Sequence, residues 1–230
     1  MATISYVTPQ HVRTSNAMSL AAANVGDANP YTLTMRNNAA AAWTFYVYQQ
    51  MPNQLSANVF SLAWFSSPYK ISVGDEIVFQ WSIDYSFVWG HTGTIQPGVT
   101  FSASGKKAAN LVSANTTTFD VSPGPNLSNP VAGPPAGSLV INNTAAVPNN
   151  TFSVGIGMGS AGTFVTAAGA NLKSTFTPTP TYWIAAGTNV QVGTILDITT
   201  VTQNSQVIFP PNVYSADYTL SGLNTWAPTT

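Results

Sequence analysis

The 230-residue chain carries six basic and seven acidic side chains, so its formal net charge is −1 and only 6% of its residues are charged. Soluble proteins average about 25% charged residues. Without a basic surface, the chain is not expected to bind nucleic acid or anionic lipid by charge attraction. Serine, threonine and asparagine replace the missing charge. Because a neutral surface gives copies of a protein little mutual repulsion, this composition favours a self-assembling or externally exposed protein.

The chain contains no cysteine, which excludes disulfides, thiolate nucleophiles and cysteine-ligated zinc. Its first residues, MATISYVTPQHVRT, lack the basic region and the apolar run of a standard secretory signal. No apolar run approaches the roughly 18 residues of a membrane-spanning helix, so no transmembrane segment is expected. We expect a protein that either stays in the cytoplasm or reaches the cell exterior without a standard leader, and the sequence leaves both alternatives open.

The predicted elements begin with an N-terminal arm, residues 1–28, which holds a strand at Thr3–Val7 and a short helix at residues 15–24. The clearest strand is predicted at residues 77–89, IVFQWSIDYSFVW, where side chains alternate between the two faces. Further strands are predicted at residues 31–35, 43–48, 163–167, 190–202, 206–209 and 217–220. This pattern predicts an all-β protein, an antiparallel β-sandwich of the jelly-roll or immunoglobulin-like type.

Weak internal similarity indicates two tandem β repeats. Residues 69–74, YKISVG, align with residues 182–187, YWIAAG, and the same offset places Asp84 opposite Asp197. We interpret the similarity as the product of an ancient duplication. The repeats form either one sandwich domain or two, and the sequence does not decide between these alternatives.

A proline-rich connection separates the predicted repeats. It covers residues 121–150 and has proline at positions 123, 125, 130, 134, 135 and 148. Because proline cannot donate a backbone hydrogen bond, we expect no central strand in this connection. The predicted organisation is an arm at residues 1–28, a first repeat at 29–120, the connection at 121–150 and a second repeat at 151–230.

Several short stretches recur together in one known family. They are YQQ at residues 48–50, SLAWF at 61–65, DYSFVW at 84–89, TGT at 92–94, PGV at 97–99, GTILDI at 193–198 and NTW at 224–226. Over residues 30–226 the chain therefore resembles the RhiA-like family of rhizosphere-expressed proteins. The resemblance implies an abundant small protein associated with plant–microbe life. It implies no enzymatic activity, cofactor or catalytic residue.

Aromatic side chains are the first candidates for a binding site. Phe79, Trp81 and Ile83 lie on one face of the predicted strand and are expected to fill the core. Trp89 ends that strand and runs into the loop Gly90-His91-Thr92-Gly93, a common position for binding residues. We therefore name Trp89, His91 and Trp64 as candidate ligand-binding residues that could stack on, or hydrogen-bond to, a sugar.

The sequence offers no convincing catalytic or metal-binding group. His91 has no neighbouring histidine or carboxylate that would complete a metal site, so neither a metal nor a cofactor is expected. Asp84 and Asp197 fall at equivalent repeat positions but inside predicted strands, where we expect them to pair with Arg36 or to accept backbone hydrogen bonds. The glycine-rich residues 155–159 do not have a nucleotide-binding spacing, and there is no G-x-S-x-G motif. We therefore expect a protein that is not an enzyme.

Two functions follow from these observations. The first is a structural or interaction protein that assembles with itself into an oligomer, filament or lattice, in the setting of host or plant–microbe interaction that the resemblance implies. Its candidate assembly residues are Thr3, Ile4, Ser5, Tyr6 and Val7, which would pair with an exposed sheet edge of the next subunit. The alternative is a lectin-like β-sandwich that binds glycans.

Overall fold

The computed structural model describes residues 3–7, 30–51, 58–159, 161–179 and 181–229. These residues form eighteen strands in four sheets and contain no helix, so the predicted all-β class is confirmed. Among them, no helix is long and apolar enough to cross a membrane. The helix predicted at residues 15–24 lies outside the described residues.

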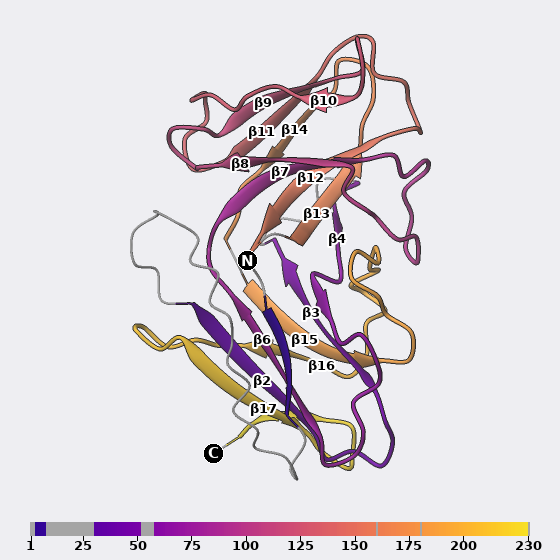
Figure 1. Ribbon diagram of the computed structural model, residues 1–230, viewed down its shortest axis with the longest axis vertical. Coiled ribbons are helices and arrows are strands. Elements are labelled where there is room, and N and C mark those ends of the chain that lie inside the picture. The colour runs from indigo at the N-terminus through magenta and orange to yellow at the C-terminus, as the bar shows by residue number, and fades with distance from the viewer. Residues whose placement is uncertain (1–2, 8–29, 52–57, 160, 180, 230) are drawn as a thin grey trace.

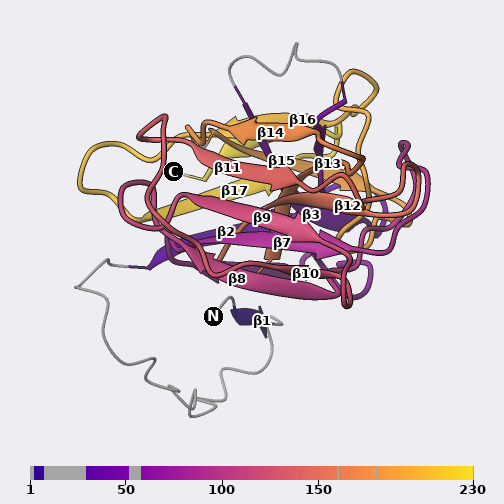
Figure 2. The ribbon, with the colours of Figure 1, turned by 90° about the horizontal axis from the view of Figure 1, so that it is seen from above.

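Two sheets form the lower half of the molecule in Figure 1, which we call sandwich 1. Sheet I has the order β1 (Thr3–Val7), β6 (Glu76–Trp81), β2 (Tyr31–Asn37), β17 (Ser215–Leu220) and β18 (Trp226–Pro228). Sheet II has the order β16 (Asn204–Val207), β15 (Thr181–Gly187), β3 (Thr44–Gln50) and β5 (Phe65–Ser66). Figure 2 shows β1 at the outside of the molecule.

The other two sheets form the upper half, sandwich 2 (Figure 1). Sheet III has the order β4 (Phe60–Ser61), β13 (Ala161–Ala167), β12 (Ser153–Met158), β7 (Tyr85–Gly90) and β8 (Gly105–Ala109). Sheet IV has the order β10 (Asn126–Leu127), β9 (Thr116–Asp120), β11 (Leu139–Asn143) and β14 (Lys173–Phe176). Most neighbouring strands are antiparallel, and the pairs β2–β17 and β9–β11 are parallel.

Each sandwich has its own apolar core, and the alternation of the sequence explains how it forms. In β6, Ile77, Phe79 and Trp81 are fully buried while the residues between them are half-buried. They pack with side chains of sheet II such as Val47 and Ile184. The core of sandwich 2 is built in the same way from residues of sheets III and IV, among them Phe87, Phe119, Ile141, Ile156 and Phe164.

The long strand predicted at residues 77–89 is two strands that serve both sandwiches. β6 belongs to sheet I and β7 to sheet III, and Ser82, Ile83 and Asp84 join them. Ile83, which was expected in the core, is 40% exposed at this junction. β6 and β7 each bury aromatic side chains from the same alternating series, so the alternation continues across the break. The sequence pattern alone therefore does not reveal the change of sheet.

Among the hydrogen bonds at the junction between the sandwiches, two hold the end of β12. The Asp84 carboxylate accepts from the backbone N–H of Gly159 at 3.0 Å, which confirms the expected role of this residue as an acceptor of backbone donors. The Trp64 indole Nε1 donates to the carbonyl oxygen of Met158 at 2.8 Å. Met158 ends β12 of sheet III, whereas Trp64 packs in the core of sandwich 1. These contacts fix the end of β12 against sandwich 1.

The other strand predictions vary in accuracy. β1 coincides with its predicted bounds, and β2, β3, β13, β16 and β17 overlap theirs. The prediction of a strand at residues 190–202 is wrong, because that segment holds turns and isolated bridges. Its apolar residues are nevertheless used: Ile195 and Leu196 are buried against the outer faces of sheets III and II. The alternation at residues 190–202 therefore belongs to a loop that covers the outer faces of two sheets. A short extended part of this loop forms an isolated bridge with Leu62.

The strands of the two predicted repeats are interleaved. β2 pairs with β17, β3 with β15 and β7 with β12, so sheets I, II and III each combine strands from before residue 121 with strands from after residue 150. The aligned residues 77–84 and 190–197 also differ in structure, since the first includes β6 and the second has no regular strand. In the chain, the strands of sandwich 2 lie mostly between β6 and β15 of sandwich 1.

The expectation of no central strand at residues 121–150 is wrong as well. β11 lies between β9 and β14 in sheet IV. It occupies the proline-free interval between Pro135 and Pro148. The high proline content of residues 121–150 as a whole was therefore a poor guide to the proline-free stretch within them, which forms a strand.

The bond between Trp64 and Met158 predicts a measurable stability difference. Trp64→Phe should lower the free energy of unfolding by about 1–3 kcal/mol beyond its packing loss, because it leaves a buried carbonyl without its donor. Trp183→Phe is the control for the change from an indole to a phenyl ring without loss of a hydrogen bond, since the Trp183 Nε1 has no partner among the described residues. Urea unfolding of both variants, followed by circular dichroism, measures the difference. Equal losses would contradict a stabilising role for the hydrogen bond.

Candidate functional site

The predicted assembly strand pairs with β6 of its own chain. β1 is antiparallel to β6 over five residue pairs, from Thr3 opposite Gln80 to Val7 opposite Glu76. On its other side, β6 pairs with β2. β1 therefore covers a backbone edge that β6 would otherwise present to solvent. Thr3, Ile4, Ser5, Tyr6 and Val7 are found in a strand, and the structure identifies the edge that accepts it.

Most other sheet edges are protected against the addition of a further strand. Lys106 and Lys107 lie on edge strand β8, Lys173 lies on edge strand β14, and Pro228 ends edge strand β18. The edge strands β4, β5 and β10 have only two residues each. Charged residues, proline and short length are the usual means by which sheet edges avoid pairing. Among the described edges, only those at β1 and β16 lack all three.

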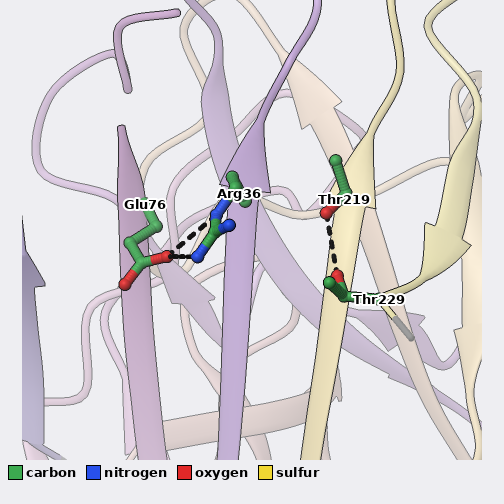
Figure 3. A network of polar contacts seen from close by, with 4 residues as sticks. All are labelled: Arg36, Glu76, Thr219 and Thr229. Carbon is green, nitrogen blue, oxygen red and sulfur yellow. Dashed lines mark hydrogen bonds and ion pairs between the residues drawn. The ribbon is translucent and has the colours of Figure 1, made fainter. Parts of the chain in front are cut away.

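An ion pair lies beside the pairing edge. The Arg36 guanidinium donates from Nε at 3.0 Å and from Nη2 at 2.5 Å to the same Glu76 carboxylate oxygen (Figure 3). Glu76 is thus the partner of Arg36, in place of the expected Asp84. Glu76 lies opposite Arg36 on one side and opposite Val7 on the other. An exposed pair of this kind contributes about 0–1 kcal/mol.

The same face of sheet I is polar beyond the ion pair. Thr219 of β17 and Thr229, just after β18, share a hydrogen bond of 2.8 Å (Figure 3). A shallow hollow of about 220 Å³ lies between Thr34, Arg36, Asp217, Tyr218 and Thr229. This face offers hydroxyl groups and charges from neighbouring strands, and it contains no set of residues with a recognisable catalytic arrangement.

Trp89, the leading sugar-binding candidate, lies at the margin of a core. Its ring is half-buried, with its centroid 5.5 Å from that of Phe119 and 6.0 Å from that of Phe152. The ring also lies across Gly105, its cross-strand partner, where an added Cβ would come within 2.4 Å of the indole Nε1. Trp89 therefore contributes packing between β7 and β8, and only part of its ring faces solvent.

The other two candidate ligand residues lie in different surroundings. Trp64 is fully buried in the core of sandwich 1, so it is not available to stack on a sugar from solvent. His91 is exposed, and its ring centroid lies 5.1 Å from that of Phe152. The structure thus places Trp89 and His91 on the same aromatic neighbour and separates Trp64 from both. Among the described residues, no three histidine or acidic side chains are grouped as a metal site would require.

The carboxylates act as local hydrogen-bond acceptors. Asp197 accepts from the backbone N–H of Thr199 at 3.1 Å and from its hydroxyl at 2.6 Å. Asp120, at the end of β9, accepts from the Thr144 hydroxyl at 2.8 Å and from the backbone N–H of Val121 at 2.7 Å. These hydrogen bonds, above all the one from Thr144, lower the pKa of Asp120. The perturbed carboxylate therefore stabilises a turn.

The lowered pKa of Asp120 predicts a pH dependence of stability. Because the folded-state pKa lies below the ordinary value of 3.8, the contribution is present above about pH 4 and is lost as the pH falls through the folded-state pKa. Asp120→Asn should therefore lower the urea midpoint at about pH 6, and the difference from wild type should shrink at about pH 3.

Thr144→Val provides the control because it removes the largest cause of the shift and keeps the carboxyl group. In this variant the pKa of Asp120, measured by carbon-13 NMR, should rise toward its ordinary value. A pKa that does not change would contradict the assigned hydrogen bond.

The sequence interpretation did not identify the strand with which β1 pairs. β6 was predicted as a strand, but its position beside β1 depends on a sheet order that the sequence does not encode locally. The signal that could have identified it is the charge pattern, because the strands with lysine are edges and β6 has none.

Comparison with known proteins agrees with the motifs found in the sequence. Residues 28–228 match the RhiA family. Protein RhiA of Rhizobium leguminosarum bv. viciae is 51% identical to this chain over 223 residues, which cover 97% of this chain and 96% of the relative. No solved structure matches the chain. Since the family match extends over nearly the whole chain, this protein belongs to the RhiA family.

Proposed function

We propose that this protein is a structural protein that assembles with itself by exchanging β1 between subunits. The observation that carries the proposal is the pairing of β1 with the edge of β6. The same five backbone pairs can form when β1 of one subunit lies on β6 of the next. Such an exchange needs no new interface chemistry, because the pairing within one chain and the pairing between chains are the same.

The length of chain between β1 and β2 supports the exchange. Residues 8–29 connect the two strands, and a chain of this length reaches about 70 Å when extended. That distance is enough for β1 to reach a neighbouring subunit. If each subunit gives its arm to the next and the ring does not close, the product is a filament or lattice.

The weak charge of the chain also favours association. With a net charge of −1, subunits repel each other little. The described lysines on β8 and β14 lie on sandwich 2, away from the β6 edge. This arrangement hinders pairing at the long edges of sandwich 2 and leaves the β6 edge able to accept a strand. The protein is not proposed to be an enzyme. Its proposed setting is the contact between microbe and plant host that the family resemblance implies.

The arm can be tested by blocking its backbone. The double variant Ile4→Pro/Ser5→Pro removes two adjacent N–H groups, of which one must face β6 in an antiparallel strand. It should reduce the mass measured by light scattering to that of the 24.2 kDa monomer, while the circular dichroism spectrum of the sandwiches is retained.

The matched control is Ile4→Ala/Ser5→Ala, which shortens the same side chains but keeps both N–H groups. It should retain assembly, because the pairing depends on the backbone. A free peptide with the sequence of residues 1–8 should compete with assembly of the wild-type protein. Assemblies that survive the proline variant, or a wild-type protein that is monomeric at all concentrations, would overturn the proposal.

A further inference from the structure

A groove opens at one end of sheet II, away from Trp89. Three strands meet there: β3 begins at Thr44, β5 ends at Ser66, and β15 ends at Gly187. The groove has a volume of about 530 Å³, within the usual range for small-molecule sites. Its lining comes from two segments far apart in the sequence, residues 66–70 and 188–192, together with Thr44.

The floor of the groove is fixed by hydrogen bonds. The buried Ser66 hydroxyl donates to the carbonyl oxygen of Val190 at 2.6 Å and so ties the two segments together. The buried Ser67 hydroxyl accepts from the backbone N–H of Phe45 at 3.0 Å. The walls are therefore held in place without a ligand, and preorganisation of this kind reduces the entropy lost on binding.

The rims carry side chains of three useful kinds. On one side are an exposed ring, Tyr69, which is 56% exposed, and an exposed ammonium group, Lys70. On the other side, the exposed amides of Asn189 and Gln191 offer donors and acceptors. The lining contains one cation and no carboxylate.

A tight turn holds the amide rim. The backbone N–H of Gln191 donates to the Thr194 hydroxyl at 3.1 Å, and the backbone N–H of Thr194 donates to the carbonyl oxygen of Gln191 at 3.0 Å. Gly193 has φ of +83°, and a Cβ there would lie 2.2 Å from the carbonyl oxygen of Phe101. Only glycine fits this position, so the turn has one shape and Gln191 has a fixed place on the rim.

We propose that this groove binds a carbohydrate that carries a carboxylate, such as a chain of uronic acids. The Tyr69 ring matches the apolar C–H face of a pyranose, and the Asn189 and Gln191 amides match its hydroxyl groups. The Lys70 ammonium matches the carboxylate, since an ionic hydrogen bond is stronger than a neutral one. A nucleic acid is a poorer match, because a phosphate chain needs several cations and the groove has one.

Calorimetric titration with two probes of equal length tests the proposal. Tetragalacturonate carries carboxylates, and its fully methyl-esterified form has the same sugar units and linkages without the charges. Wild-type protein should bind tetragalacturonate, and it should bind the methyl ester about tenfold more weakly or worse, as expected for one lost ionic hydrogen bond. Tyr69→Ala should weaken binding of tetragalacturonate by up to about tenfold through loss of ring contact.

Two lysine variants localise the charge effect. Lys70→Gln should abolish the preference for the acidic probe, whereas Lys106→Gln, which removes an exposed lysine of β8 on sandwich 2, should leave it unchanged. Gln191→Ala should weaken binding of both probes, because the amide contacts hydroxyl groups that both contain.

Three results would contradict the proposed carbohydrate site. No binding of either probe, equal binding of both probes, or binding that Tyr69→Ala and Lys70→Gln leave unchanged would each overturn the proposal. The assembly proposal is tested independently, since Tyr69→Ala should keep the assembled mass and Ile4→Pro/Ser5→Pro should keep the affinity for tetragalacturonate.

Discussion

The unpaired backbone at the edges of its sheets is the constraint that shapes this molecule. Four open sheets have eight edges, and each edge presents N–H and C=O groups that another strand could use. A chain with six cations cannot protect all of them with charge. Three lysines lie on two edge strands of sandwich 2. Three other edge strands have only two residues each, and β18 ends with proline. The β6 edge is covered in a different way, by the backbone pairing of β1.

The contacts that join the two sandwiches also use few charged groups. The junction uses a single carboxylate, Asp84, and one indole N–H, from Trp64, to hold the end of β12. Neither contact requires a buried charge pair, which would need compensation for its lost hydration. The segment that forms one rim of the groove continues into Ile195 and Leu196, which are buried against the outer faces of sheets III and II.

The sequence predicted what depends on local alternation and missed what depends on sheet order. Alternate burial in β6 follows directly from the sequence, as does the strand β1. By contrast, the alternation at residues 190–202 arises because apolar residues of a loop are buried against the outer faces of two sheets. A loop and a strand therefore share the same alternating sequence pattern. Trp64 was named as a candidate ligand-binding residue because the sequence alone does not distinguish an aromatic side chain in a core from one that stacks on a ligand. The groove was invisible because Tyr69 and Asn189 meet only after β3, β5 and β15 are aligned.

The order of strands along the chain also affects how the protein is made. Sandwich 2 is mostly complete once β14 has been synthesised, whereas sheets I and II still lack β15, β16, β17 and β18. During that interval, β2 and β3 on the ribosome have no partners from the C-terminal part of the chain, although β2 can already pair with β6. Such unpaired strands favour association between nascent chains. β1 precedes these strands in the chain, so it can cover the β6 edge of sheet I before β15, β16, β17 and β18 are made.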